Sequence, residues 1–501
     1  MHAPDCGTFR ITQSGDGAMM RQYPSSDEFN LAAHCMFDIA PVTTGVKERI
    51  GAIPEGTWQG TFNFAVEPQI PFKEVVKDEP RLKGLPKYAL NMAQWRVDQG
   101  VLANNTVSTD CPLSLQFYAE MAVYAPVMKD NISPMALVVP SVDRYLDGLG
   151  GHLMWHGLKV EITPPGKWNA SLESGGFIIN SAWYAVRTLG EKNLLGRWLP
   201  RLEALAGHLE AHDRDGDGIV ESGDRGHWFD TYALPEGVKE AHSTAVNYDA
   251  FRHLANLETL AGRKEQAAHW QARADLIKQN YLKVFFNPET GVIGGWRDKE
   301  GKLHDPMFPW VNGYGICAGL VDDALAKSIL EKFLAKMKEI GFGEAQYKYG
   351  MLTNLLPLKP DEWNHHGAHE WQGYMNGSIT PPYSNYFIMA LYKHGFREIA
   401  EQLLWAQVGS FDKGTFNSGV RIPHLPVRNP VGSAFYKWDG SMANGEGYLP
   451  ENWHAYVGIF AGHYGIRFDE NGYSLEKGSP LKGKKISCGL PVMGKIQGVV
   501  E

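Results

Sequence analysis

The feature that most restricts the fold of this sequence is a series of helical segments joined alternately by short and long connections. From about Leu85 onward, apolar residues recur at the three- and four-residue spacing of one helix face. The connections at Gly262–Arg263 and His394–Phe396 are short, whereas others are long and carry Trp, Asp, Glu and His. Short connections join antiparallel neighbours, which predicts helical hairpins with one plain end and one elaborate end. The predicted helices span residues 86–98, 112–125, 135–148, 174–189, 193–211, 242–262, 264–284, 311–320, 323–340, 378–394, 396–410 and 451–464.

Hairpins of this kind predict a mainly α fold, an (α/α)6 barrel whose long loops cover one face and form a pocket. An irregular helical bundle is the alternative, because no repeat is evident in the sequence. Pro200 lies inside the helix predicted over 193–211 and indicates that the first turn of that helix begins there.

The first part of the chain has a different character. Gly7–Thr12 and Thr57–Val66 alternate in the manner of strands, and a Pro-rich charged run follows them. We therefore predict a small β-rich or irregular region with a linker over residues 1–85, and the barrel domain over residues 86–501.

Charge and cysteine usage exclude several classes of protein. A net charge of −8 argues against a nucleic-acid or anionic-membrane partner. The five cysteines are scattered, which predicts neither a disulfide framework nor a metal site with close ligand spacing. Met1–Arg21 shows no signal peptide, and no apolar run reaches the ~18 residues of a membrane span. We expect a cytoplasmic protein, or a secreted or periplasmic one if the N-terminus is processed, and the sequence leaves its oligomeric state open.

Aromatic residues point to a class of ligand. The chain has 15 Trp and 21 Tyr, many of them in Gly-, Pro- and Asn-rich segments. Such residues anchor loops, or they stack on the apolar faces of sugar rings. The second role predicts a carbohydrate substrate.

The acidic stretch His212–Tyr232 is predicted to be a loop, because Gly and Asp disfavour helix and favour turns. Asp213, Asp215 and Asp217 match the start of an EF-hand loop, and Asp224 stands at the twelfth position, where a Glu normally closes the site. The stretch predicts either a structural calcium ion or an acidic turn without a metal.

Trp228, Phe229 and Asp230 end the same stretch. A carboxyl group among aromatic rings has its pKa raised and can serve as a general acid near neutral pH. The alternative role of Asp230 is to cap a following turn.

A second group of residues lies in His365–Pro382. His365 and His369 have the spacing of a zinc pair, but zinc needs three or four protein ligands. Trp371, Tyr374 and Asn376 suit the wall of a sugar site better.

A third group follows Trp438. Glu446 lies between two glycines and near Tyr448, so its carboxylate can approach a substrate with little steric cost. Asp439 and Glu451 are its rivals, and Glu451 resembles a first-turn helix residue. Two carboxylates on distant aromatic loops are what glycoside hydrolysis requires, one as the acid and one as the base.

At these residues the chain resembles glycoside hydrolase family 63 and related six-hairpin glycosidases. DRDGDGIVES followed by WFD resembles their acidic loop and catalytic-acid motif. EWQGYMNGSITPPYSNYFIMALYKHG and GEGYLPENWHAYVGIFAGHYGI are similar to the segments that carry a sugar wall and the general base. The resemblance implies Asp230 as general acid and Glu446 as general base.

The same resemblance implies that Trp228, Trp371 and Asn376 line the sugar subsite. We also predict that the neighbouring aromatic residues of the three loops bind substrate, namely Phe229, Tyr374, Trp438 and Tyr448. The chain departs from the family beside Asp230 and at Gln372–Met375, where the family has Arg-Gly-Pro-Val.

The expected protein is thus an inverting, exo-acting, α-glucosidase-like glycoside hydrolase that requires no cofactor. An α-L-rhamnosidase-type hydrolase and a glycoside phosphorylase are alternatives within the fold, and Arg421 and His424 would anchor the phosphate of the latter. A carbohydrate-binding barrel without catalysis is the alternative outside enzymes.

Overall fold

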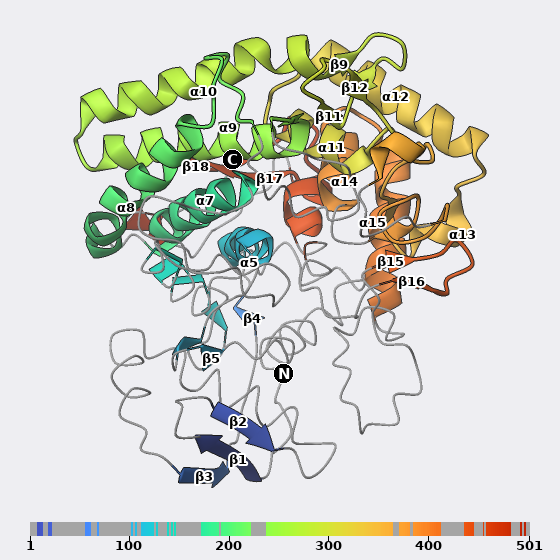
Figure 1. Cartoon of the computed structure of the whole chain (residues 1–501). Coiled ribbons are helices and arrows are strands. Elements are labelled where there is room, and N and C mark those ends of the chain that lie inside the picture. The colour runs from blue at the N-terminus through green and yellow to red at the C-terminus, as the bar shows by residue number, and fades with distance from the viewer. Residues whose placement is uncertain are drawn as a thin grey trace.

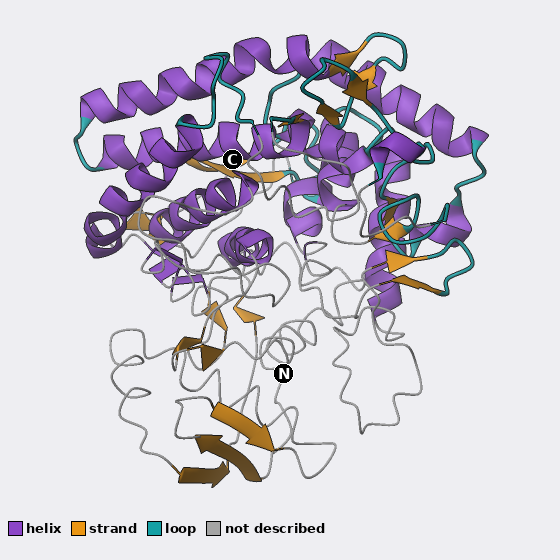
Figure 2. Cartoon of the chain, in the orientation of Figure 1, coloured by secondary structure: helices purple, strands orange, loops and turns teal. Residues whose placement is uncertain are grey.

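Helices dominate the part of the chain that the structure describes (Figures 1 and 2). This computed structural model describes residues 8–13, 19–22, 56–61, 68–69, 102–103, 106–107, 112–124, 127–128, 138–139, 142–143, 145–146, 172–189, 192–221, 237–363, 370–380, 384–411, 435–444, 454, 457–481, 491–492 and 495–496. The prediction of a mainly helical chain is confirmed. Among the described helices, none has the length and apolar character needed to cross a bilayer.

The helices pack as consecutive pairs. The pairs are α7 (Leu172–Leu189) with α8 (Lys192–Glu210), α9 (Ala241–Leu260) with α10 (Lys264–Phe285), α11 (Pro309–Cys317) with α12 (Asp323–Glu339), and α14 (Ser384–Lys393) with α15 (Arg397–Phe411). Only a few residues connect the two helices of each pair, whereas consecutive pairs are separated by the long segments 211–240, 286–308 and 340–383. A hairpin reverses the chain, so the first helices of the pairs run parallel and start at the same end, where the long segments lie.

The first helix of each pair is more deeply buried than the second. All of Pro309–Ile316 in α11 is buried, as is most of α9. The outer helix α10 instead buries one stripe at helical spacing, formed by Trp270, Ala274, Ile277, Tyr281 and Phe285. The pattern separates inner helices, covered on all sides, from amphipathic outer helices.

The inner helices contact one another in chain order. Helix α5 (Pro112–Tyr124) packs on α7, α7 on α9, α9 on α11, α11 on α14, and α14 on the π-helix η5 (Gly458–His463). The series returns to its start, because Tyr124 of α5 stacks on Phe460 of η5 with ring centroids 5.3 Å apart.

The strands are short and form small antiparallel sheets. The N-terminal sheet has the order β2-β1-β3, in which Thr8 pairs with Thr61 and Gln13 with Gly56. The predicted strands are therefore confirmed over residues 8–12 and 57–61, and residues 7 and 62–66 lie outside the described residues. The strands are β1 (Thr8–Gln13), β2 (Met19–Gln22), β3 (Gly56–Thr61), β4 (Pro68–Gln69), β5 (Leu102–Ala103), β6 (Thr106–Val107), β7 (Val127–Met128), β8 (Lys239–Glu240), β9 (Phe286–Asn287), β10 (Val292–Ile293), β11 (Trp296–Arg297), β12 (Leu303–His304), β13 (Met351–Leu352), β14 (Ile379–Thr380), β15 (Phe435–Tyr436), β16 (Met442–Asn444), β17 (Ile466–Asp469), β18 (Gly472–Leu475), β19 (Pro491–Val492) and β20 (Lys495–Ile496). Two single-turn elements, α13 (Glu344–Tyr347) and the 3-10 helix η3 (Pro360–Glu362), complete the described elements.

Three helix predictions need correction. Pro200 lies inside α8 rather than in its first turn, and the buried residues Trp198 and Leu202 on either side hold the helix together across it. Helix α14 begins at Ser384, because Ile379 and Thr380 pair in a sheet instead. The last predicted helix contains the π-helix η5. The predicted helix over 86–98 lies outside the described residues, and the division of the chain at residue 85 stays a prediction.

Candidate active site

The end of the molecule where the inner helices begin collects the long loops. Strand β8 leads directly into α9, whose first turn Glu240 caps by accepting hydrogen bonds from the backbone N–H groups of His242 (2.8 Å) and Ser243 (2.5 Å). His242 packs edge-on against Trp310 in the first turn of α11, with ring centroids 4.7 Å apart. The Trp310 indole N–H in turn donates to the carbonyl of Thr353, 3.0 Å away. Consecutive loops are thus in contact at this end.

A four-stranded sheet brings the second and third groups of predicted site residues together. Its order is β13-β14-β15-β16, so the segment that ends in β14 pairs with the segment that follows residue 434. Ile379 of β14 is the partner of Tyr436 of β15. Residues more than 50 positions apart in sequence therefore lie side by side.

Two tryptophans form a half-buried aromatic pair beside this sheet. The rings of Trp371 and Trp438 lie 6.3 Å apart at an interplanar angle of 58°. The Trp438 indole N–H donates to the carbonyl of Gly377 at 2.8 Å. The Trp371 ring lies so close to Gly377 that a Cβ there would stand 2.3 Å from it. Gly377 also has a φ of 77°, so the pair depends on a glycine at this position.

Tyr374 and Asn376 occupy the same loop but play different structural parts. Tyr374 is half-buried and has a φ of 38°, in the left-handed region. Asn376 is buried, and its side-chain oxygen accepts the backbone N–H of Leu358 at 3.0 Å. The loop is thereby tied to the neighbouring segment. That both residues contact a sugar stays a prediction.

Several predicted site residues lie outside the described residues. These are the general acid Asp230 and its neighbours Trp228 and Phe229, the general base Glu446 with Tyr448, the loop residue Asp224, the histidines of the zinc alternative, His365 and His369, the phosphate anchors Arg421 and His424, and the rival carboxylate Glu451. The rival Asp439 is described, and it is an exposed residue whose carboxylate accepts two hydrogen bonds from Ser441, at 2.8 and 2.6 Å.

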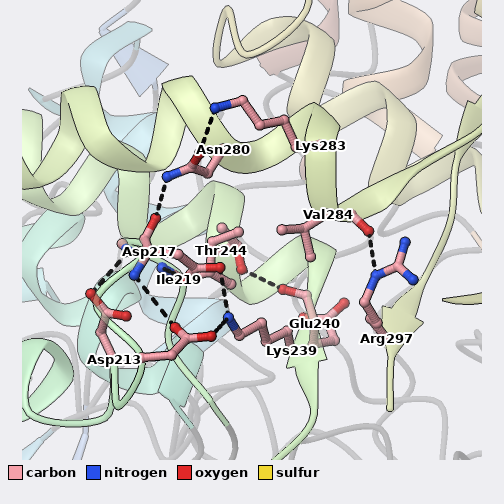
Figure 3. Close-up of polar contacts among 12 residues, drawn as sticks. Asp213, Asp217, Ile219, Lys239, Glu240, Thr244, Asn280, Lys283, Val284 and Arg297 are labelled. Carbon is pink, nitrogen blue, oxygen red and sulfur yellow. Dashed lines mark hydrogen bonds and ion pairs between the residues drawn. The ribbon is translucent and has the colours of Figure 1, made fainter. Parts of the chain in front are cut away.

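The acidic turn places its three aspartates together. Carboxylate oxygens of Asp213, Asp215 and Asp217 lie within 4.8 Å of one another, close enough to share a cation. Asp215 and Asp217 both accept hydrogen bonds from the Lys239 ammonium at 2.6 Å, as Figure 3 shows for Asp217. Asp213 accepts a hydrogen bond from Arg273 at 2.7 Å. Basic side chains thus contact all three carboxylates, and the structural calcium ion stays a prediction.

Sequence reasoning missed a buried polar cluster between the inner helices. Glu120 of α5 forms an ion pair with His454 and accepts hydrogen bonds from Gln116 and the Tyr386 hydroxyl, both at 2.8 Å. His454 is fully buried and stacks on Phe117 at 4.2 Å. Nothing in the local pattern around Glu120 distinguishes it from any other helix residue.

A cavity of about 690 Å³ adjoins this cluster and reaches the end where the short connections lie. Glu120, Asp249, Tyr314 and Tyr386 line it, together with the turn of the β17–β18 hairpin. Burial raises the pKa of Asp249 to about 7, although Arg252 opposes this shift. Arg252 donates to Asp249 (3.3 Å) and to Glu470 (2.8 Å), which ties the hairpin to α9.

The sequence was compared with known proteins. The model of the "bacterial alpha-L-rhamnosidase 6 hairpin glycosidase domain" matches residues 88–349, and no curated protein matches the chain. Similar solved structures include a family 78 rhamnosidase of a Bacillus species, at 13% identity and a TM-score of 0.47, over 81% of this chain and 38% of that chain. A rhamnosidase from Klebsiella oxytoca with rhamnose bound has 13% identity and a TM-score of 0.48, over 82% and 69% of the two chains. A family 63 mannosylglycerate hydrolase from Thermus thermophilus has 12% identity and a TM-score of 0.45, over 69% and 91%.

The family match covers the hairpins from before α5 to the end of α13. The predicted membership in the six-hairpin glycosidases is confirmed by it. The chain belongs to the family of the bacterial α-L-rhamnosidase six-hairpin glycosidase domain.

Proposed function

We propose that the protein is an inverting, exo-acting glycoside hydrolase that removes a terminal sugar from an oligosaccharide or glycoside. The observation that carries the proposal is the match of residues 88–349 to a six-hairpin glycosidase domain. The structure supports it by collecting the long loops, the predicted place of the chemistry, at one end of the inner helices.

The finer architecture is proposed to be an (α/α)6 barrel with a small β-rich N-terminal region. The inner helices support this, because they contact one another in chain order and the last returns to the first through Tyr124 and Phe460. In such a barrel the pocket opens where the inner helices begin, which is the end that carries Trp371 and Trp438.

In the proposed reaction Asp230 protonates the leaving oxygen of the glycosidic bond. Glu446 removes a proton from a water molecule, whose oxygen attacks the anomeric carbon from the opposite face. Inverting enzymes hold these carboxyl groups about 6.5–9.5 Å apart to leave room for that water. The half-buried pair Trp371 and Trp438 would stack against the apolar face of the sugar.

The family match favours a terminal α-L-rhamnoside as the substrate, because the matching domain is described as that of α-L-rhamnosidases. An α-glucoside is the second candidate, on the motifs shared with family 63. A glycoside phosphorylase would differ from both by its requirement for inorganic phosphate, and a binding protein without catalysis would show no turnover.

The first test is a panel of aryl α-L-rhamnosides, α-glucosides and other glycosides, with and without phosphate. The anomer of the first product is followed by NMR. Hydrolysis with inversion is expected, and retention of configuration or release of a sugar phosphate would contradict the proposed mechanism.

The second test replaces the two proposed catalytic carboxylates. Asp230→Asn and Glu446→Gln are each expected to lower kcat by a factor on the order of 10³ or more, because each removes an acid–base group of the transition state. Asp439→Asn is the control, since this exposed carboxylate is already bound to Ser441. Near-normal turnover of Asp230→Asn or Glu446→Gln, with a native circular dichroism spectrum, would refute the assignment.

A further inference from the structure

The acidic turn that follows α8 binds its own backbone and basic side chains of the chain. One oxygen of each carboxylate accepts a backbone N–H: Asp213 from Gly218 (2.9 Å), Asp217 from Ile219 (2.9 Å) and Asp215 from Asp217 (3.4 Å). Gly216 and Gly218 supply the positive φ angles of 77° and 89° that the turn requires. One oxygen from each of the three carboxylates lies within 4.8 Å of the other two, close enough for one cation to contact more than one of them.

Lys239 supplies such a cation. Its Nζ lies 2.6 Å from Oδ2 of Asp215 and 2.6 Å from Oδ2 of Asp217, and its side chain is only 13% exposed. Burial by itself would lower the pKa of Lys239, but the hydrogen bonds and charges of the two aspartates raise it above its ordinary value. The ammonium therefore stays charged, and it neutralises part of the repulsion within the turn.

The backbone of Lys239 pairs with two other segments of the chain. It forms an isolated antiparallel bridge with Glu221 and pairs with Arg297 in the β8–β11 ladder. The side chain of the next residue, Glu240, caps α9, and its backbone carbonyl accepts a hydrogen bond from the Thr244 hydroxyl at 2.6 Å (Figure 3). Residues 222–238 run between Glu221 and Lys239, and they include Asp230.

We propose that the Lys239 ammonium is the resident cation of the acidic turn, in the place that Ca²⁺ takes in an EF-hand loop, and that it positions the two described ends of the segment carrying Asp230. The positioning role rests on the proposed function, whereas the resident-cation role does not. The turn is then independent of calcium in the wild-type protein, and removal of the ammonium converts it into a calcium site. Asp213 favours this conversion, because its Oδ1 is buried and has no hydrogen-bond partner.

The principal test is Lys239→Met, which removes the charge and keeps the length of the side chain. Wild-type protein is expected to have the same Tm in excess calcium chloride and in excess chelator. Lys239→Met is expected to have a lower Tm in chelator, to bind calcium in titration calorimetry, and to regain most of the lost Tm on calcium addition. The control is Lys299→Met, because Lys299 is 65% exposed and its nearest carboxylate, in Glu300, is 3.9 Å away.

The activity of the same variants tests the positioning role. Lys239→Met in chelator is expected to lose between about tenfold and a hundredfold in kcat, the effect of misplacing a catalytic group by about 1 Å, with KM nearly unchanged. Calcium is expected to restore kcat. A purely structural lysine would lower the concentration of active enzyme without this calcium-dependent recovery of turnover per folded molecule.

Two results would overturn the resident-cation role. One is a fall in the wild-type Tm on chelation, which would mean that a metal ion already occupies the turn. The other is a Lys239→Met protein that matches Lys299→Met in Tm and shows no response to calcium.

If Lys239→Met does not fold in chelator, Asp217→Asn and the double variant Asp217→Asn/Lys239→Met complete a double-mutant cycle. The double variant is expected to be less destabilised than the sum of the single variants, and strict additivity would refute the contact. None of these stability measurements depends on turnover. A fully active Asp230→Asn protein would therefore refute the proposed function and leave this inference standing.

Discussion

At the scale of single residues, His304 shows how two carboxylates outweigh the effect of burial. Its ring is 5% exposed, and its nitrogens lie 2.9 Å from Oδ2 of Asp298 and 3.2 Å from Oε1 of Glu362. Burial lowers the pKa of His304, but the hydrogen bonds to Glu362 and Asp298 outweigh burial and raise it. The His304 bond also depresses the pKa of Asp298 against the effect of burial. The contact between His304 and Glu362 joins the β11–β12 hairpin to η3.

These shifts fix the pH range in which the contact stabilises the fold. A histidine whose pKa is raised in the folded state contributes its full stability at pH values below its unfolded pKa of about 6.5. That stability is lost as the pH rises through the folded pKa. The folded pKa of Asp298 is depressed, so this carboxylate contributes stability above its unfolded pKa of about 3.9. That stability is lost as the pH falls through the folded pKa. The Tm difference between wild type and His304→Gln is therefore expected to be largest between these limits and to shrink as the pH rises through the raised folded pKa of His304. Thermal unfolding across this range checks it, and a pH-independent difference would contradict it.

Single residues also show which parts of the candidate site can be predicted from the sequence. Composition and loop context predict that Trp371 and Trp438 bind the sugar; the structure brings the two rings within 6.3 Å of each other, and their sugar-binding role stays a prediction. Glu120 and His454 were not predicted, because their pairing spans 334 positions and neither has a local signature. Periodicity and motifs report neighbours along the chain, so contacts between distant helices escape them.

At the scale of elements, periodicity predicted most described helices to within a few residues. α10 was expected over 264–284 and spans Lys264–Phe285, since its apolar stripe recurs at helical spacing. The start of α14 was predicted too early, because Ile379 and Thr380 are apolar or β-branched and suit either state. The β17–β18 hairpin was not predicted.

The aromatic loop gives an element-scale prediction. Gly377→Ala is expected to displace Trp371, because the new Cβ would stand 2.3 Å from its ring. KM for the sugar substrate should rise roughly tenfold, equivalent to about 1.4 kcal/mol of lost binding. Steady-state kinetics and tryptophan fluorescence measure the two effects.

Gly319→Ala is the matched control for this change. Gly319 has nearly the same φ, 78° against 77°, but its Cβ would meet nothing within 4 Å. Both variants carry the same backbone strain, so the difference between them isolates the displaced ring. Equal KM values for the two variants would show that Trp371 does not contribute to sugar binding.

At the scale of the whole molecule, the Glu120–His454 contact joins α5 to a residue 334 positions later in the chain, four positions before η5. His454→Gln would leave the buried Glu120 carboxylate without its histidine partner. Removing one member of a buried pair costs roughly 3–5 kcal/mol, and the remaining hydrogen bonds from Gln116 and Tyr386 bring the expected loss to about 2–4 kcal/mol.

Urea unfolding of this variant is compared with that of His269→Gln. His269 forms the same kind of contact with Glu210, at 3.2 Å, but its side chain is 50% exposed. Exposed pairs are worth about 0–1 kcal/mol. A loss in His454→Gln no greater than in His269→Gln would show that the ion pair does not hold the inner helices together.

The separation of Glu120 and His454 in the sequence also has a consequence for the chain during translation. Ribosomes add roughly 5–20 residues per second, so the 334 positions between Glu120 and His454 correspond to roughly 17–67 seconds of synthesis. Until the end of that interval Phe117 lacks its stacking partner His454, and Tyr124 lacks its stacking partner Phe460. The nascent protein therefore carries an open apolar edge until translation is nearly complete, and a chaperone that shields this edge would act on α5 while the ribosome is still working.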